Sequence, residues 1–102
     1  MLFRSGGTDT GPAPYELLLS GLAACTALTL RMYADRKGWV LGEIDVIARF
    51  RRDADGTEWV EREVGLTAAL DAAQRDRLAE ICAKTPVTKT LNRGMAIVTK
   101  IL

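Results

Sequence analysis

Residues 14–37 have the sequence PYELLLSGLAACTALTLRMYADRK, and this almost unbroken apolar run decides the expected fold. We predict one long helix that begins at about residue 13 or 14 and ends at residue 37. Glu16 suits the positive end of the helix dipole, and Gly38 suits the helix stop. Apolar residues occupy nearly every direction around this helix, which is typical of a central, buried helix. One domain of 102 residues provides little cover for it, so we expect oligomerisation.

The next segment has the pattern of a β-hairpin. Residues 40 to about 52 alternate between apolar and polar side chains, which predicts a half-buried strand. Residues 53–56 are a turn sequence whose Asp55-Gly56 pair favours a hairpin. Residues 57 to about 69 return as a second strand. On that strand Arg62 is an exception, because it is charged and falls on the apolar face.

The last third of the chain predicts a helix and a strand. We expect the helix to run from Asp71, which suits the N-cap position, to about Lys84. Pro86 interrupts it, and residues 86–92 are compatible with a short helix or a turn. Residues 95–102 are apolar and alternate weakly, which suggests a last strand. The order defines one α+β domain over residues 1–102 with an antiparallel or mixed sheet.

Composition and charge narrow the class of protein. With 48% hydrophobic residues, 26% charged residues and a net charge of +1, the chain is globular and has no basic face for nucleic acid. The arginines at 49–52 are largely cancelled by the acidic residues that follow them. The apolar run contains Glu16, Arg31 and Asp35, so we expect no membrane span, and no secretion signal is expected either. A soluble, cytoplasmic protein is the simplest interpretation.

The chain contains no histidine, which limits its chemistry. Ser-His-Asp and Cys-His pairs are excluded within the chain, as are metal sites that contain histidine. The two cysteines, Cys25 and Cys82, lie 57 positions apart and do not make a zinc site unaided. We therefore expect no metal and no cofactor, and acid–base chemistry would fall to Asp, Glu, Lys, Tyr or Cys.

Cys25 lies in the middle of the predicted long helix. Its neighbours one helical turn away are uncharged, and Arg31 lies roughly 120° around the helix. Such surroundings disfavour the thiolate. Cys25 therefore either packs as a structural residue or depends on a cation from another element or subunit. Cys82 lies on the apolar face of the second helix, where packing is expected, although a Cys25–Cys82 disulfide would form if the Cα atoms came within about 7 Å.

Three segments resemble the OsmC/Ohr family. They are GGTDTGPAPYELLLSGLAACT at residues 6–26, LRMYA at 30–34 with KGW at 37–39, and TPVTKTL at 85–91. The resemblance extends over essentially the whole chain. It implies the OsmC-like fold, in which long central helices pack against antiparallel or mixed sheets. It also implies an intertwined homodimer with two active sites at the subunit interface.

The resemblance implies a redox activity for Cys25. The characterised members are peroxiredoxin-like thiol peroxidases that reduce organic hydroperoxides in oxidative-stress defence. Cys25 matches the peroxidatic position, where the thiolate attacks the O–O bond and becomes a sulfenic acid. A second cysteine then resolves it to a disulfide, which a dithiol reductant reduces.

The chain departs from the family pattern at the residues around this site. The family's resolving cysteine directly precedes a Pro-Val or Pro-Tyr pair, a position that Thr85 occupies here. Cys82 lies three residues earlier and is the alternative resolving residue, with packing as its other interpretation. The family glutamate ten residues before the peroxidatic cysteine is replaced by Tyr15, and Glu16 lies nine residues before it. Tyr15, Glu16 and Thr85 are the expected pocket residues.

The cation that would activate Cys25 is not identified by the resemblance. In the family it is an arginine on an N-terminal strand some forty residues before the cysteine, and only 24 residues precede Cys25 here. The candidates are Arg4, Arg31 and Lys84, supplied across the dimer. Two functions therefore stay open: a hydroperoxide reductase that uses Cys25, and a non-catalytic OsmC-fold dimer that binds a small apolar ligand at its interface. A purely structural dimer is a third interpretation.

Overall fold

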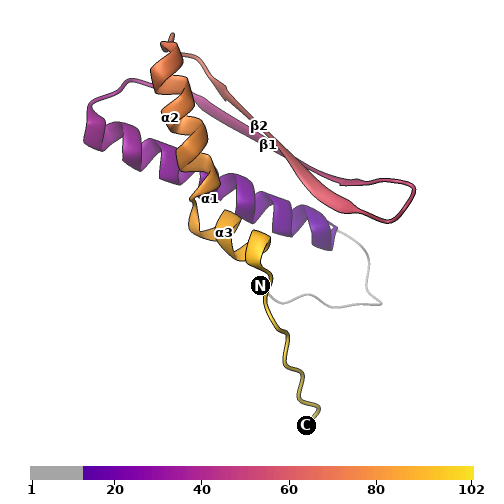
Figure 1. Cartoon of the computed structure of the whole chain (residues 1–102). Helices are drawn as coiled ribbons and strands as arrows, with labels where there is room; N and C mark the ends of the chain where they lie inside the picture. Colours follow the sequence, from indigo (N-terminus) through magenta and orange to yellow (C-terminus); the bar gives the residue numbers. More distant parts are fainter. Residues whose placement is uncertain (1–12) are drawn as a thin grey trace.

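The computed structural model describes residues 13–102, in which one β-hairpin lies along a long helix and two shorter helices follow it in the chain (Figure 1). The elements are α1 (Pro14–Lys37), β1 (Ile44–Arg52), β2 (Glu58–Leu66), α2 (Ala72–Ala83) and α3 (Pro86–Arg93). The expected α+β class is confirmed. The segment that was compatible with a short helix or a turn is the helix α3.

The bounds of α1 agree with the prediction because both ends carry specific signals. Pro14 occupies the first helical position, where its missing N–H removes no helical hydrogen bond. Gly38 ends the helix in a left-handed conformation with φ 70°, and its N–H reaches the carbonyls of Ala34 and Asp35.

The hairpin is shorter than expected but has the expected pairing. β1 and β2 are antiparallel, and the register is continuous over the nine residues of each strand. Residues 40–43 stay outside the strand, because Gly42 has a left-handed φ of 71°. A Cβ at Gly42 would lie 2.0 Å from Oγ1 of Thr67, so this close approach of two chain segments needs glycine. Thr67 Oγ1 in turn accepts a hydrogen bond from the N–H of Glu43.

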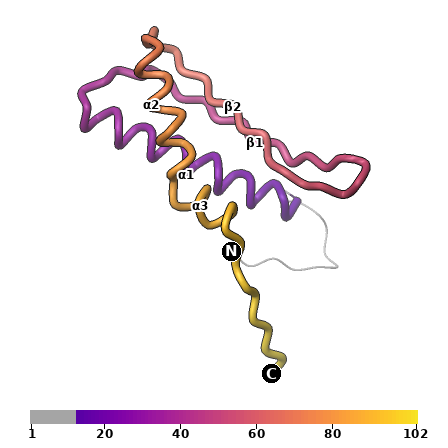
Figure 2. Tube along the Cα trace, in the orientation of Figure 1, coloured from indigo at the N-terminus to yellow at the C-terminus, as the bar shows by residue number. Residues whose placement is uncertain are grey.

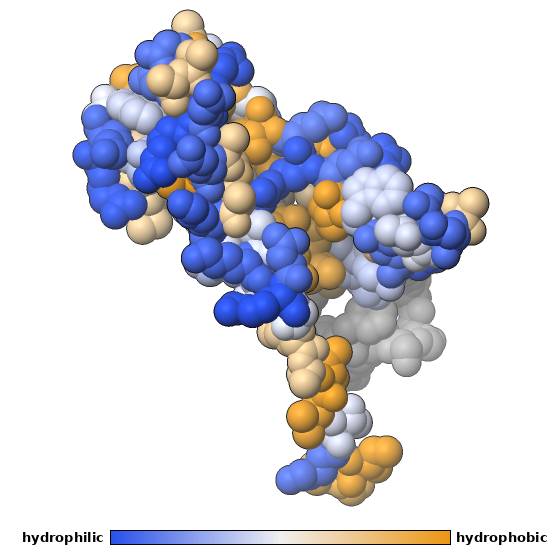
Figure 3. Space-filling view, in the orientation of Figure 1, coloured by the Kyte–Doolittle hydropathy of each residue, from blue (hydrophilic) through white to orange (hydrophobic). Residues whose placement is uncertain are grey.

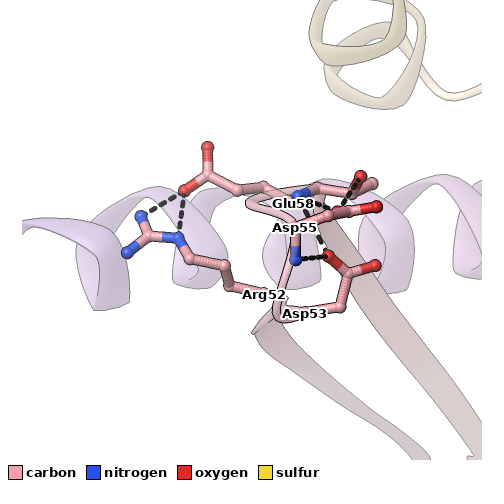
Figure 4. A network of polar contacts seen from close by, with 5 residues as sticks. Arg52, Asp53, Asp55 and Glu58 are labelled. Atoms are coloured by element: carbon pink, nitrogen blue, oxygen red, sulfur yellow. Dashed lines mark hydrogen bonds and ion pairs between the residues drawn. The ribbon is translucent and has the colours of Figure 1, made fainter.

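The hairpin turn is held by short polar side chains (Figure 4). Oδ1 of Asp53 accepts the N–H groups of Asp55 and Thr57, and Oδ1 of Asp55 accepts the N–H and hydroxyl of Thr57. Interaction with the Asp53 side chain, followed by the hydrogen bonds from Thr57, lowers the pKa of Asp55 to about 2. Arg52 and Glu58 pair across the strands beside this turn. The sequence prediction of a turn here is confirmed.

The core lies where the C-terminal half of α1 meets α2 and the start of the hairpin. Its buried residues form one cluster: Leu30, Tyr33, Ala34, Leu41 and Leu78. In Figure 2 the hairpin runs along α1, while α2 crosses α1 and leads into α3. α1 contacts β1, α2 and α3, so it is the central element of the described chain.

The C-terminal segment does not form the predicted strand. Residues 95–102 have no regular secondary structure and extend away from the body of the molecule (Figure 1). Met95, Ile97, Val98 and Ile101 are each at least 71% exposed. The side chains of this segment do alternate weakly in the sequence, but a strand also needs a partner strand. Within residues 13–102, no strand pairs with this segment.

α1 is long and apolar enough to cross a membrane by length and composition. The expectation that its charged residues would prevent this is therefore wrong on these criteria. Core helices of soluble proteins pass the same test. α1 packs on β1, α2 and α3, and 28% of its apolar window is buried in the single chain.

Candidate functional site

Cys25 is a free, half-buried thiol on the flank of α1. The buried face of α1 carries Leu22, Thr26, Leu30, Tyr33 and Ala34. At about 100° per residue, Cys25 lies roughly 110° from the middle of that face. The thiol is therefore neither in the core cluster nor on the fully exposed side of the helix.

Cys25 belongs to a second apolar row on α1, which we name the Cys25 stripe. Its members are Leu18, Gly21, Cys25, Leu28 and Met32, spaced three or four residues apart on one side of the helix. Leu28 and Met32 are each 65% exposed. The expectation that α1 is buried on all sides therefore does not hold within one chain, because the hairpin, α2 and α3 cover only one face.

Arg62 on β2 is a half-buried charged residue. Its guanidinium donates hydrogen bonds to Oγ1 of Thr26 at 3.0 Å and Oγ1 of Thr88 at 2.7 Å, and to the carbonyl of Cys82 at 3.0 Å. These acceptors belong to α1, α3 and α2, so one side chain of the hairpin joins all three helices. Its place on the apolar face of the strand was the signal in the sequence, but its partners were not predicted.

Thr85 is fully buried beside this arginine. Its hydroxyl lies 2.6 Å from the hydroxyl of Thr88 and accepts the N–H of Thr88, which caps α3. Thr26 also donates to the carbonyl of Leu22 at 2.8 Å. We call the set Thr26, Arg62, Thr85 and Thr88 the Arg62 cluster. Thr85 therefore belongs to a hydrogen-bonded network that begins one residue from Cys25.

Cys82 is half-buried against the core cluster and is also a free thiol. Burial raises the pKa of the Cys82 thiol, and the nearby charge of Arg62 acts in the opposite direction with the smaller effect. Its environment is that of a packed thiol. The structure places Cys82 among residues on the buried side of α1 and Cys25 on the flank, and no disulfide joins them.

The other predicted residues lie apart from Cys25. Tyr15 stacks on Phe50 with ring centroids 5.0 Å apart, and Glu16 is exposed on the first turn of α1. The guanidinium of Arg31 donates to the carbonyl of Gly42 at 2.6 Å.

None of the proposed cations is brought to Cys25 in the described part of the chain. Lys84 is exposed at the end of α2, and Arg4 lies outside the described residues. Over residues 13–102, no hydrogen bond joins a cationic side chain to the Cys25 thiol. A cation that activates Cys25 would therefore have to come from residues outside 13–102 or from a second subunit.

Arg62 borders a larger and a smaller cavity among the described residues. The larger, about 490 Å³, lies between α1, the hairpin and α3, and its wall is mostly apolar, with Leu19, Leu22, Val60 and Leu91 contributing. The smaller, about 300 Å³, lies between β2 and α2 and is bordered by Cys82. Figure 3 shows apolar surface in the recess between the helices and the hairpin.

Residues 13–102 contain no group of three His, Cys, Asp or Glu side chains that could hold a metal ion. The elements available for chemistry are thus a half-buried thiol on a central helix, a partly buried arginine–threonine network and an apolar cavity. Together with the α+β arrangement, they define a thiol-containing protein built around one long apolar helix. The family of OsmC-like proteins matches residues 7–100, and the chain belongs to that family.

Solved structures agree with this assignment at the level of the fold. A protein from Psychrobacter arcticus, described as an osmotic-stress-induced and detoxification-response protein, is 18% identical with a TM-score of 0.68. The match covers 83% of this chain and 64% of that one. An OsmC-like protein from Mycoplasma pneumoniae is 23% identical with a TM-score of 0.63, over 87% of this chain and 68% of that one. A comparison with curated proteins gives no match.

Proposed function

We propose that the chain is a thiol-dependent organic hydroperoxide reductase in which Cys25 is the nucleophile. The observation that carries this proposal is the match to the OsmC-like family over residues 7–100, and the sequence resemblance implies the peroxidatic role for Cys25. A free thiol that is only half-buried is accessible to a substrate. The description of the Psychrobacter arcticus protein as a detoxification-response protein is in keeping with such a role.

The proposed reaction is a two-electron reduction of the O–O bond. The Cys25 thiolate attacks one peroxide oxygen, the O–O bond breaks, and the leaving alkoxide takes a proton to become an alcohol. Cys25 is thereby oxidised to the sulfenic acid. A dithiol reductant then restores the thiol, releasing water and becoming a disulfide itself, which suits a reducing, cytoplasmic setting.

Cys82 is the alternative resolving residue, and the structure argues against an efficient role. Burial raises the pKa of its thiol, which lowers the thiolate fraction available to attack a sulfenic acid. Thr85 has no redox chemistry, and its hydroxyl is already engaged by Thr88. We therefore propose a one-cysteine cycle in which an external dithiol regenerates Cys25.

We also propose that the working form is a homodimer. Leu28 and Met32 of the Cys25 stripe are each 65% exposed, and residues 95–102 present further apolar side chains without a partner. A second copy that covers both would bury the apolar surface that one chain leaves open. It would also place residues of the other subunit beside Cys25, where an activating cation is needed.

The test uses reduced protein and an organic hydroperoxide such as cumene hydroperoxide with a dithiol. Hydroperoxide consumption should be lost in Cys25→Ser and retained in Cys82→Ser, and mass spectrometry should find one added oxygen on Cys25. Consumption that is unchanged in Cys25→Ser would overturn the proposal. A Cys25–Cys82 disulfide would overturn the one-cysteine cycle while leaving the reductase in place.

A second candidate function is non-catalytic binding of a small apolar ligand. It is favoured by the cavity of about 490 Å³ with a largely apolar wall, and by the lack of a cation on Cys25 in the described contacts. This candidate predicts an unreactive Cys25 together with saturable binding of an apolar fluorescent probe. Rapid formation of sulfenic acid at Cys25 would exclude it.

A further inference from the structure

Arg62 keeps unused hydrogen-bonding capacity. A guanidinium has five N–H groups, and three of them serve Thr26, Thr88 and the carbonyl of Cys82. All three acceptors are neutral. Among residues 13–102, no carboxylate lies within 4.0 Å of Arg62, although four other arginines of this region do form such ion pairs. The positive charge is therefore held in place by neutral groups and lacks a counterion in the described chain.

The Nε–H group of Arg62 remains accessible. It makes no hydrogen bond to the described residues, and no buried side-chain nitrogen or oxygen of these residues lacks a hydrogen-bond partner, so this donor is not sealed inside the protein. Arg62 borders the cavity between α1, the hairpin and α3. A guanidinium with its orientation fixed and with donors free is the arrangement that binds a carboxylate, because little side-chain freedom is left to lose.

The cavity extends from Arg62 along the same face of β2. Val60 and Glu58 follow at alternate positions toward the turn, a span of about 13 Å at the usual strand rise. The volume of about 490 Å³ falls within the range of small-molecule sites, about 300–1,000 Å³.

The wall of the cavity is aromatic away from Arg62. Tyr15, Phe50 and Trp59 all border it, and they are three of the six aromatic residues in the chain. Tyr15 and Phe50 stack on each other, while Trp59 is 43% exposed. Aromatic walls gain contact energy with an aromatic ligand beyond the area that is buried.

The charges along the cavity set the orientation and the charge of the ligand. Arg62 is positive at one end, and Glu58, paired with Arg52, is the carboxylate at the other end. A carboxylate would pair with Arg62, whereas a second negative charge on the same molecule would find no unpaired cation at the other end, where Arg52 is already paired with Glu58. A single carboxylate attached to an uncharged ring satisfies both ends.

We propose that this cavity binds an aromatic monocarboxylate, with the carboxylate on Arg62 and the ring against Tyr15 and Phe50. The site is separate from the thiol chemistry of Cys25 and does not depend on it.

The test compares two ligands of the same shape and different charge. We expect 2-naphthoate to bind the whole protein in calorimetric titrations. The affinity for the neutral 2-naphthamide should be lower by at least about tenfold. In Arg62→Gln the affinity for the acid should fall to that for the amide. Arg49→Gln is the matched control, because it removes an exposed arginine of the same hairpin, and it should bind the acid like the wild type.

Two further variants separate ligand binding from misfolding and from the proposed reductase activity. Leu91→Trp fills the cavity while leaving Arg62 in place, and it should weaken both ligands. Cys25→Ser should bind 2-naphthoate normally, whether or not the chain is a hydroperoxide reductase. Equal affinity for acid and amide in the wild type would overturn the proposal. So would the failure of both to bind, as expected if a second copy of the chain fills the cavity.

Discussion

At the scale of single residues, Arg62 is the point where the polar contacts inside this molecule converge. Its three acceptors lie 36, 26 and 20 positions away in the sequence. No local pattern reports contacts over such separations, so the sequence marked Arg62 only as a charge on an apolar face. In the structure, the Arg62 side chain joins the hairpin to all three helices through hydrogen bonds.

Removing this junction should destabilise the fold. We expect Arg62→Gln to lower the free energy of unfolding by about 2–3 kcal/mol, since charge-assisted hydrogen bonds to partly buried acceptors are lost. Arg49→Gln, which breaks an exposed ion pair on the same hairpin, should cost under about 1 kcal/mol. Urea unfolding followed by circular dichroism, at one fixed protein concentration, measures both. Equal losses in the two variants would show that Arg62 is only another surface charge.

The half-buried thiol of Cys82 makes stability depend on pH in a defined direction. Burial raises the folded-state pKa of Cys82 above its ordinary value of 9.0. The folded chain therefore holds this proton more tightly than the unfolded chain. The stabilising contribution is complete below pH 9.0 and is lost as the pH rises through the folded-state pKa.

Unfolding experiments in urea at about pH 7.5 and about pH 10 can detect this loss. Cys82→Ala should reduce the decline in the free energy of unfolding between the two pH values. Cys25→Ser is the control for thiol titration in general and should keep the decline that Cys82 causes. If Cys82→Ala declines as steeply as the wild type, the thiol is not desolvated in the folded state.

At the scale of elements, the sequence predicted what local signals determine. Pro14 and Gly38 mark the ends of α1, and Asp71 caps α2 with a complete capping box to Gln74. The strand limits were less predictable. β1 begins only after Gly42, because Gly42 closely approaches Thr67 from across the hairpin. The prediction of a strand at residues 95–102 was wrong. Alternation of apolar side chains can be seen in one segment, whereas strand pairing depends on a second segment that the sequence pattern does not report.

The same reasoning explains the candidate site. Cys25 is predicted as the nucleophile because it lies in a sequence motif of the family. The role of Thr85 in a buried network could not be found, because its partners come from α1, β2 and α3 together. The sequence motif points to Cys25, whereas the neighbouring hydrogen-bonded network of Thr85 is visible only in the folded structure.

Thr85 should matter as the cap of α3. We expect Thr85→Ala to lower the free energy of unfolding by about 1–2 kcal/mol, because the N–H of Thr88 loses its acceptor. Thr85→Ser keeps the hydroxyl and should recover most of this loss. Thr90→Ala is the control, because the side chain of Thr90 makes no hydrogen bond within residues 13–102. Thermal and urea unfolding distinguish the outcomes, and a loss in Thr90→Ala as large as in Thr85→Ala would contradict a specific cap.

At the scale of the whole molecule, one chain leaves too much apolar surface uncovered. The Cys25 stripe includes Leu28 and Met32, which stay exposed, and the C-terminal segment carries apolar side chains into solvent. Exposed apolar surface of this continuity marks an interaction surface in a soluble protein. The proposed homodimer accounts for both features at once, and it gives Cys25 access to side chains from a second copy.

A charge placed on the stripe tests this assembly. If a second copy covers the stripe, Met32→Glu would bury an unpaired carboxylate there and should dissociate the dimer. Light scattering after size-exclusion chromatography should give the wild type twice the 11.1 kDa of the chain, and Met32→Glu a single chain. Ala73→Glu adds the same charge to an exposed position on α2 and should leave the dimer intact. A wild type that stays at 11.1 kDa at high concentration would refute the dimer, and the activation of Cys25 would then have to come from the chain itself.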